Sequence, residues 1–262
     1  MKNETPPLPK GSNEFVEAFA KGLAVISAFK DGQDGLTITD IAMRAKLDRA
    51  GARRLMLTLV RLGYATQRET FFSLTPRVLR LGFAYLSSLS VRDVAQPLID
   101  ELSRRVNEQA AVSVLDGEDI VYVARSAWQR TFWRQLTVGS QLPAYCTSTG
   151  RVLLAAKSPV EREAYLANVE LTPFTKHTVC DRNTLRAELD LVDKQGWAAI
   201  FHELELGIVG VAVPIRNSSG TVVAALNIGG SPSSFTNTSY VETFLPSALE
   251  TAEKISARLI VS

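Results

Sequence analysis

The sequence predicts an α+β protein of two domains, a winged helix-turn-helix followed by a larger domain built around an antiparallel sheet. The 262 residues can form two cores. Residues 1–85 hold 13 Lys and Arg against 8 Asp and Glu, whereas the remainder holds 16 against 19. After Asn107 the apolar periodicity changes from helical spacing to strand alternation. A basic module that binds nucleic acid therefore precedes a domain with another task.

Composition and periodicity place the domain boundaries. We expect a disordered Pro-rich tail over 1–13, the winged helix-turn-helix over 14–76, a linker helix over 77–92 and the second domain over 93–262. Two cysteines exclude a disulfide framework. With no apolar leader and no stretch long enough for a membrane span, we expect a cytoplasmic protein that does not bind membranes.

Three helices open the chain. Apolar residues at helical spacing predict the first over 15–29, before the loop "KDGQDG". Thr37 and Asp40 read as a capping box, so a short helix runs to about Ala45. Asp48 then caps a third helix. Two helices separated by about three residues predict a helix-turn-helix.

The third helix has two chemically different sides. Its apolar side gathers Ala52, Leu55, Met56, Leu59, Val60 and Leu62, and the opposite side gathers Arg53, Arg54 and Arg61. No Asp or Glu lies between Arg49 and Arg68 to pair with these arginines. The alternative is an ordinary solvated basic face, but unpaired charge favours an anionic partner. Next, "YATQRETFFSL" reads as two strands of a wing with Arg68 at its tip.

The segment from Pro76 to about Arg105 is helical, with interruptions expected near Ser90 and at Pro97. An apolar stripe follows three- and four-residue spacing over Leu79, Phe83, Leu86 and Leu89. We interpret the stripe as a dimer interface that spaces two recognition helices; the alternative is packing on the chain's own core.

The second domain mixes strands and helices. Strands are expected in "AAVSVLDGEDIVYVARS", around an Asp-Gly turn, in "TFWRQL", and in "GIVGVAVPIRNSSGTVVAALNIGG". Helices are expected in "TSTGRVLLAA", "VEREAYLANV", "NTLRAELDLVDKQG" and "YVETFLPSALETAEKISARLI". This order is typical of an α+β sensor domain.

Catalytic and cofactor motifs are missing from the sequence: it has no GxSxG, Walker or HExxH pattern, so we expect no enzyme and no cofactor. His177, Cys180 and His202 could begin a zinc site, but a fourth ligand is not apparent. Glu203 and Glu205 in "HELELG" read as an exposed strand or loop end, and Cys146 as a buried structural thiol. The alternative functions are a metal- or redox-sensing regulator, or an enzyme of the sensor-domain fold that uses the winged helix for assembly.

Several segments resemble one family. "FAKGLAVISAF", "LTITDIAMRAKLDRAGARRLMLTLVRLGYA" and "FSLTPRVLRLG" are similar to the DNA-binding domain of IclR-family transcriptional regulators, and "VGSQLPAYCTSTGRVLLA" and "ELELGIVGVAVPIRNSSGTVVAALNIGG" to their GAF-like effector domain. Both effector-domain segments resemble most closely the branch that controls aromatic acid breakdown, such as the protocatechuate and 4-hydroxybenzoate pathways. Lys46 departs from the family, which usually has Gly in this turn.

The helix-turn-helix pattern and the resemblance together imply a DNA-binding face. We expect the helix from about Arg49 to Leu62 to enter the major groove of double-stranded operator DNA, with the protein acting as a homodimer or a dimer of two dimers. The expected contacts are base or phosphate readers, a thymine methyl contact and backbone contacts, supplied by Thr39, Lys46, Arg49, Ala50, Arg53, Arg54, Thr58, Arg61 and Arg68.

The second domain is expected to bind a small organic acid, most simply an aromatic acid or its ring-cleavage product. Thr147, Ser148 and Thr149 precede an apolar helix, and hydroxyls and free amides there suit an anion; the alternative is that they only cap the helix. The resemblance adds Thr131, Arg134, Leu142, Ile200, His202, Gly210, Asn227 and Gly229. Among these, Arg134 is expected to pair with the carboxylate.

Overall fold

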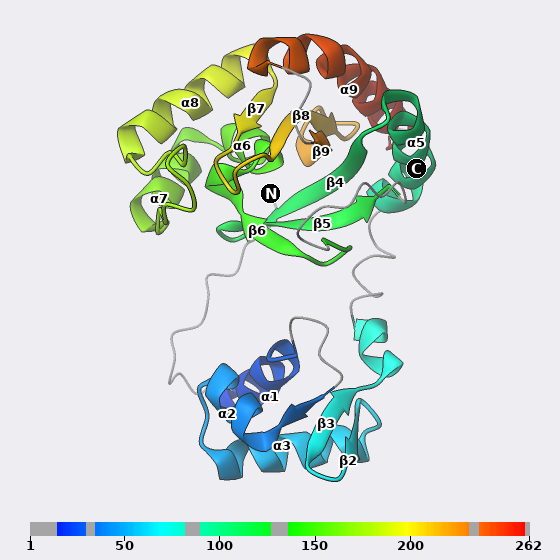
Figure 1. The fold of residues 1–262 in the computed structure, drawn as a ribbon, viewed down its shortest axis with the longest axis vertical. Coiled ribbons are helices and arrows are strands. Elements are labelled where there is room, and N and C mark those ends of the chain that lie inside the picture. Colours follow the sequence, from blue (N-terminus) through cyan, green and yellow to red (C-terminus); the bar gives the residue numbers. More distant parts are fainter. Residues whose placement is uncertain (1–14, 30–34, 82–89, 127–135, 231–235, 260–262) are drawn as a thin grey trace. The chain divides into compact units, whose positions relative to one another are not determined.

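The computed structural model describes residues 15–29, 35–81, 90–126, 136–230 and 236–259 (Figure 1). The predicted tail, the strand "TFWRQL" up to its last residue, and residues 82–89 of the predicted linker helix lie outside these ranges. The chain divides into two compact units, Met1–Ser87 and Ser88–Ser262.

The amino-terminal unit is a winged helix-turn-helix. It contains α1 (Glu17–Ser27), β1 (Leu36–Thr37), α2 (Ile38–Ala45), α3 (Arg49–Arg61), β2 (Ala65–Arg68), β3 (Phe71–Leu74) and the 3-10 turn η1 (Pro76–Val78). The strands pair antiparallel in the order β1-β3-β2. The predicted capping box is present, because the Asp40 amide donates to Thr37 Oγ1 and the Thr37 amide donates to Asp40 Oδ2. Asp48 caps α3 by accepting from the Gly51 amide at 2.7 Å.

The core of this unit lies between α1, α2, α3 and β3, where Val25, Ile41, Ala52, Met56 and Phe72 are buried. Leu62 was expected on the apolar side of α3, and this expectation is wrong, since its side chain is 53% exposed. The helix ends at Arg61, so Leu62 sits at the edge of the apolar stripe beyond the last regular turn.

The carboxy-terminal unit is built on one curved antiparallel sheet. Its strands are β4 (Gln109–Asp116), β5 (Asp119–Arg125), β6 (Gln141–Pro143), β7 (Ala198–Phe201), β8 (Val209–Arg216) and β9 (Val222–Gly230). Their order in the sheet is β6-β5-β4-β9-β8-β7. The helices are α5 (Ser90–Val106), α6 (Ser148–Ala155), α7 (Pro159–Asn168), α8 (Arg182–Gln195) and α9 (Asn237–Leu259), with a 3-10 turn η2 (Ala144–Cys146).

Helices cover both faces of this sheet. α5 and α9 pack on each other and on the outer face, whereas α6 lies within the curve against β4, β8 and β9 (Figure 1). All eight residues of α6 are buried, and α8 packs on its other side. Because α6 starts directly above the strands, its first turn faces the space enclosed by the curved sheet.

The expected interruption at Pro97 does not occur, since α5 continues through it. Proline removes one helical hydrogen bond and normally kinks a helix. Here Leu98, Ile99 and Leu102 are buried directly after it, so packing against the sheet holds the helix together.

Candidate functional site

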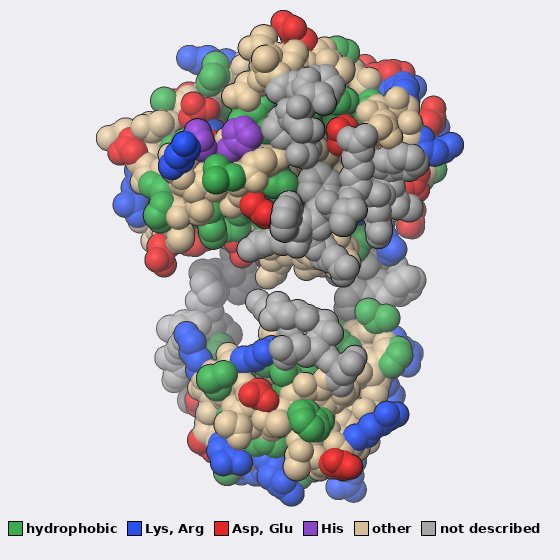
Figure 2. All heavy atoms as spheres, viewed as in Figure 1, with side chains coloured by type: hydrophobic (Ala, Val, Ile, Leu, Met, Phe, Trp, Pro, Cys, Tyr) green, Lys and Arg blue, Asp and Glu red, His purple; other side chains and the backbone are tan. Residues whose placement is uncertain are grey.

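The predicted DNA-contacting residues form an exposed basic surface on the amino-terminal unit. Lys and Arg side chains gather along α3 and the β2–β3 wing (Figure 2). All nine residues are exposed: Thr39, Lys46, Arg49, Ala50, Arg53, Arg54, Thr58, Arg61 and Arg68. Within the described residues none of the five arginines among them forms a salt bridge. Their positive charge is therefore available to a partner.

Contacts within the unit refine this surface. Leu57 was missed, although its side chain is 40% exposed and lies one helical turn from Arg53 and Arg61. The Thr58 hydroxyl donates to the Arg54 carbonyl at 2.9 Å, so it is already used within the helix. Arg77 is structural, because its Nη1 donates to the carbonyl of Leu62 at the end of α3.

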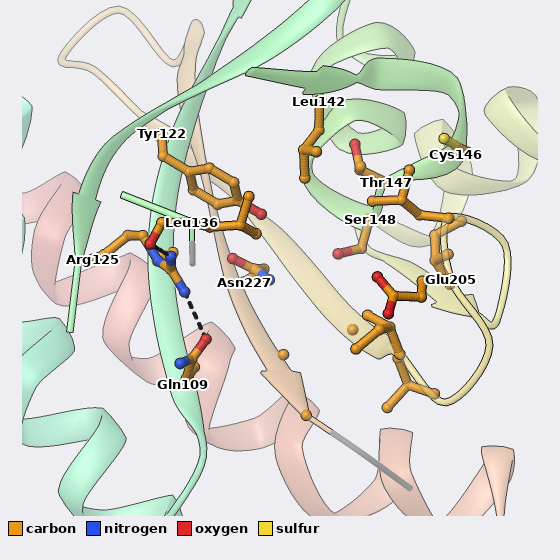
Figure 3. A pocket seen from close by; sticks show the side chains of 18 residues that line it. Gln109, Tyr122, Arg125, Leu136, Leu142, Cys146, Thr147, Ser148, Glu205 and Asn227 are labelled. Carbon is orange, nitrogen blue, oxygen red and sulfur yellow. Dashed lines mark hydrogen bonds between the residues drawn. The ribbon is translucent and has the colours of Figure 1, made fainter. Parts of the chain in front are cut away.

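A largely apolar pocket lies in the carboxy-terminal unit between the curved sheet, the first turn of α6 and the β7–β8 loop (Figure 3). Its floor contains Gly210 paired with Gly229 on the neighbouring strand. A Cβ atom on Gly210 would lie 3.0 Å from Ser148 Oγ, and one on Gly229 would lie 3.3 Å from Asn227 Nδ2. Glycine at both positions leaves a bare patch of backbone on which a flat group fits.

Arg125 at the end of β5 supplies a positive charge to one end of this pocket. Its Nη2 donates to Gln109 Oε1 at 2.6 Å and its Nη1 to the Leu136 carbonyl, and its guanidinium lies 5.4 Å from the centre of the Tyr122 ring. Burial lowers the pKa of Arg125, but an arginine stays charged in proteins. No described carboxylate forms a salt bridge with it, so the described residues provide no counter-ion at this end.

The three hydroxyl residues at the start of α6 have different roles. Thr147 lines the pocket and also caps the helix, since its Oγ1 accepts from the Gly150 amide at 3.2 Å. Thr149 does not line the pocket: its Oγ1 accepts from Ser113 Oγ on β4. Ser148 lines the pocket, and its side chain points into it (Figure 3). The structure therefore confirms the capping contact of Thr147, and ligand binding by Thr147 and Ser148 stays a prediction.

The other residues predicted to bind the ligand fall into three groups: those that line the pocket, those outside the described residues, and one that is described but does not line the pocket. Lining positions are found for Leu142, Ile200, Gly210, Asn227 and Gly229. Thr131 and Arg134 lie outside the described residues. His202 does not line the pocket, because its Nδ1 accepts from the Gly207 amide at 3.0 Å and closes the β7–β8 loop.

Sequence reasoning missed one wall of the pocket. The residues not predicted include Gln109, Tyr122, Arg125, Leu136, Glu205 and Ile208. An available signal was strand alternation in "DIVYVARS", which puts Tyr122 and Ala124 on one face and Val123 and Arg125 on the other. That pattern could not show which face of β5 borders a cavity.

Glu203 and Glu205 were both expected at an exposed strand or loop end, and this expectation is wrong for Glu203. Its side chain is buried, and its Oε2 accepts from Arg151 Nη2 at 2.8 Å and from the Val179 amide at 3.2 Å. Burial raises the pKa of Glu203, and Arg151 acts against that rise. Glu205 is partly buried and lines the pocket.

The sulfur and imidazole groups give little support to metal or redox sensing. Cys146 is fully buried, and burial raises the pKa of its thiol to about 12, so it stays protonated. The rings of His177 and His202 lie 5.7 Å apart. Over the described ranges, no three His, Cys, Asp or Glu side chains gather as a metal site would require. Equally, none of the helices described there has the length and apolar character to cross a membrane.

Comparison with known proteins gives consistent matches over the whole chain. Residues 18–69 match the family described as IclR helix-turn-helix domain, and residues 83–257 match bacterial transcriptional regulator IclR C-terminal. The Pca regulon regulatory protein of Pseudomonas putida is 42% identical over 95% of this chain and 86% of its own length. A putative transcriptional regulator from Rhodococcus sp. RHA1 superposes with a TM-score of 0.81 at 43% identity, covering 94% of this chain and 98% of that one. An IclR homolog from Microbacterium hydrocarbonoxydans, solved with 4-hydroxybenzoate, has a TM-score of 0.81 at 27% identity, covering 94% and 100%.

Proposed function

Because the chain belongs to the IclR family of bacterial transcriptional regulators, we propose that α3 and the wing bind operator DNA under the control of a small aromatic acid in the pocket. The proposal places the protein in the cytoplasm, where such DNA is found. The observation that carries it is Arg125, a cation without a described carboxylate partner, beside a glycine floor inside an apolar pocket. The names of the similar proteins, a Pca regulon regulator and a 4-hydroxybenzoate complex, support the ligand class.

DNA binding rests on the unpaired arginines of α3. Arg53 and Arg54 project from the exposed side of the helix, and a bidentate contact to a base edge contributes about 1 to 3 kcal/mol of discrimination. We expect Arg53→Ala and Arg54→Ala each to weaken specific operator binding by about that amount, and phosphate contacts to give a steep salt dependence. Arg258→Ala, an exposed change in α9, is the matched control. Unchanged operator affinity in both variants would contradict the assignment.

Ligand binding rests on charge and shape together. A carboxylate in an apolar pocket is costly unless it is paired, and a guanidinium matches its two oxygens. Arg125 is the described arginine that can supply this pairing, and Arg134 stays a prediction. A planar ring would lie on the Gly210–Gly229 patch.

Calorimetric titration tests the pocket. We expect 4-hydroxybenzoate or protocatechuate to bind the wild-type protein, and Arg125→Ala to cost about 2 to 5 kcal/mol, because it removes one partner of a buried charge pair. Gly229→Val should also weaken binding by filling the floor. Arg134→Ala addresses the second arginine, and Arg258→Ala is again the control. Tight pyruvate binding with no response to aromatic acids would overturn the ligand class.

We also propose that the protein acts as a homodimer. One winged helix buries too little surface for tight specific binding, and two-fold symmetry doubles the contacts. Phe19 and Leu23 of α1 and Leu79 after η1 are exposed, as dimer contacts would be in a single chain. Leu86→Glu should weaken association and operator binding together. Sedimentation that shows a monomer with full operator affinity would refute the dimer, and the same measurement distinguishes a dimer from a dimer of dimers.

A further inference from the structure

Charged side chains of opposite sign face the pocket from its two ends. Figure 3 shows Arg125 and Gln109 at one end, Glu205 beside Ser148 at the other, and Asn227 between them. Among the described residues no donor hydrogen-bonds to the Glu205 carboxylate and no cation pairs with it. A ligand that fills the pocket would therefore meet a guanidinium at one end and, at the other, a carboxylate to which no described residue donates.

Asn227 adds a second unsatisfied acceptor. Its Oδ1 is buried without a hydrogen-bond partner, the one such side-chain atom among the described residues. Buried polar atoms in native proteins nearly always have a partner, because leaving one unpaired is costly. Since Asn227 lines the pocket, a bound ligand can provide the missing donor.

The β7–β8 loop does not need the Glu205 side chain for its shape. The Ile208 amide donates to the Glu205 carbonyl at 3.2 Å, and the Gly207 amide donates to His202 Nδ1. These contacts involve main-chain atoms of Glu205 and Gly207. Replacement of the carboxylate alone should leave the loop intact.

Resting on the proposed function, we infer that Glu205 is a specificity-determining residue that admits hydroxylated monocarboxylates and rejects dicarboxylates. The ligand carboxylate lies toward Arg125, and a hydroxyl on the far side of the ring donates toward Glu205 and Asn227. A second carboxylate at that position would face Glu205, and like charges brought together in an interface are strongly unfavourable.

Para-substituted benzoates test this inference, because they share a ring and a first carboxylate. The probes are 4-hydroxybenzoate, benzoate, 4-methoxybenzoate and terephthalate, titrated calorimetrically into wild type, Glu205→Gln and Asn227→Ala. The control is Glu170→Gln, which removes an exposed acid far along the chain from the pocket-lining residues. Thermal unfolding of each variant checks that it is folded.

We expect wild type to prefer 4-hydroxybenzoate over terephthalate by about 100-fold or more, as like-charge repulsion predicts. Glu205→Gln should reduce that preference to about 10-fold or less, mainly by tighter terephthalate binding. Asn227→Ala should reduce the preference for 4-hydroxybenzoate over 4-methoxybenzoate, and Glu170→Gln should change neither ratio. Equal wild-type affinity for 4-hydroxybenzoate and terephthalate would overturn the role of Glu205, and so would a ratio of these two affinities that Glu205→Gln leaves unchanged. Either result would leave the proposed function standing. If no benzoate binds to wild type, the proposed function itself fails.

Discussion

Cys146 and Cys180 are the two cysteines of the chain, and they lie in opposite environments. Cys146 lines the pocket with a fully buried thiol whose pKa is raised to about 12 by burial, and a nearby carboxylate, Glu203, adds to the rise. Cys180 is exposed. Since the thiolate is the reactive form, the pocket thiol is a packing group rather than a redox sensor.

Alkylation with iodoacetamide at pH 8 should therefore modify one thiol per folded chain, at Cys180. Unfolding in guanidinium chloride should release the second. Mass spectrometry of digested protein assigns the sites, and Cys180→Ala provides the control because it should abolish labelling of the folded protein. Fast modification of Cys146 in the folded state would contradict the buried environment.

Lys46 adopts a left-handed backbone, with φ 54° and ψ 45°, at the end of α2. Glycine adopts this conformation without strain, whereas a side chain costs about 1 kcal/mol. The Lys46 side chain is exposed beside α3 and can contact a phosphate.

Lys46→Gly should consequently raise the free energy of unfolding of the amino-terminal unit by about 1 kcal/mol. It should also weaken operator binding and reduce the salt slope by about one. Urea unfolding and titrations at several salt concentrations measure the two effects. If the variant is less stable than wild type and binds the operator with unchanged affinity, Lys46 neither strains the backbone nor contacts a phosphate.

The Arg151–Glu203 ion pair joins three elements around the pocket. Arg151 belongs to α6, Glu203 lies in the β7–β8 loop, and the Val179 amide ties the segment before α8 to the same carboxylate. Arg151 Nη1 also donates to Glu188 of α8, whose side chain is 41% exposed. Because the Arg151–Glu203 pair is buried, loss of one member leaves an uncompensated charge in the core.

We therefore expect Arg151→Ala to destabilise the carboxy-terminal unit by about 3 to 5 kcal/mol. Arg162→Ala removes a pair with Asp190, which is 53% exposed, and screening by solvent limits its cost to about 1 kcal/mol or less. Urea unfolding of the two variants makes the comparison. If both variants lost a similar amount of unfolding free energy, burial would not be what sets the strength of the Arg151–Glu203 pair.

The Arg151→Ala variant should also show a distinctive pH dependence. Burial already raises the pKa of Glu203, and removal of Arg151 takes away the main opposing influence. A carboxyl whose pKa is raised by folding favours the folded state when protonated, and this advantage is lost as the pH rises through its folded pKa. The stability gap between the variant and wild type should thus narrow as the pH falls from 8 to 5, measured by urea unfolding at each pH. A gap that widens over this range would contradict the role given to Glu203.

At the level of the molecule, the predicted DNA-contacting face and the pocket belong to different compact units. A ligand that binds only the folded form stabilises it by about 2.7 kcal/mol when its concentration is 100 times Kd. The described residues that line the pocket all belong to the carboxy-terminal unit.

Saturating 4-hydroxybenzoate should hence slow amide hydrogen exchange in β4, β5, β9 and the β7–β8 loop, and raise the unfolding temperature of that unit. Without DNA, exchange in the buried core of the amino-terminal unit should change much less. Arg125→Ala at the same ligand concentration is the control. Equal protection of both units would require that the ligand also binds to the winged helix.

The sequence by itself determined the local structure and the family. The Thr37–Asp40 and Asp48 caps, the apolar and basic sides of α3 and the strand alternation after Asn107 depend on neighbours within a few residues, and the structure confirms them. Seven of the residues that it predicted for the ligand line the pocket, because glycine and short polar residues on β8, β9 and at the start of α6 carry the family pattern.

Only the tertiary structure decided which side chains face one another across the curved sheet. Arg125 was overlooked because its partner Gln109 takes its place in the pocket only when β4 pairs with β9, a strand from a distant part of the sequence. That pairing brings Gln109 opposite Gly229 and builds one end of the pocket. Glu203 and Glu205 look alike in "HELELG", yet one is buried against Arg151 and the other lines the pocket. Burial and charge pairing depend on the sum of contacts from distant segments, and spacing along one strand or helix does not contain that sum.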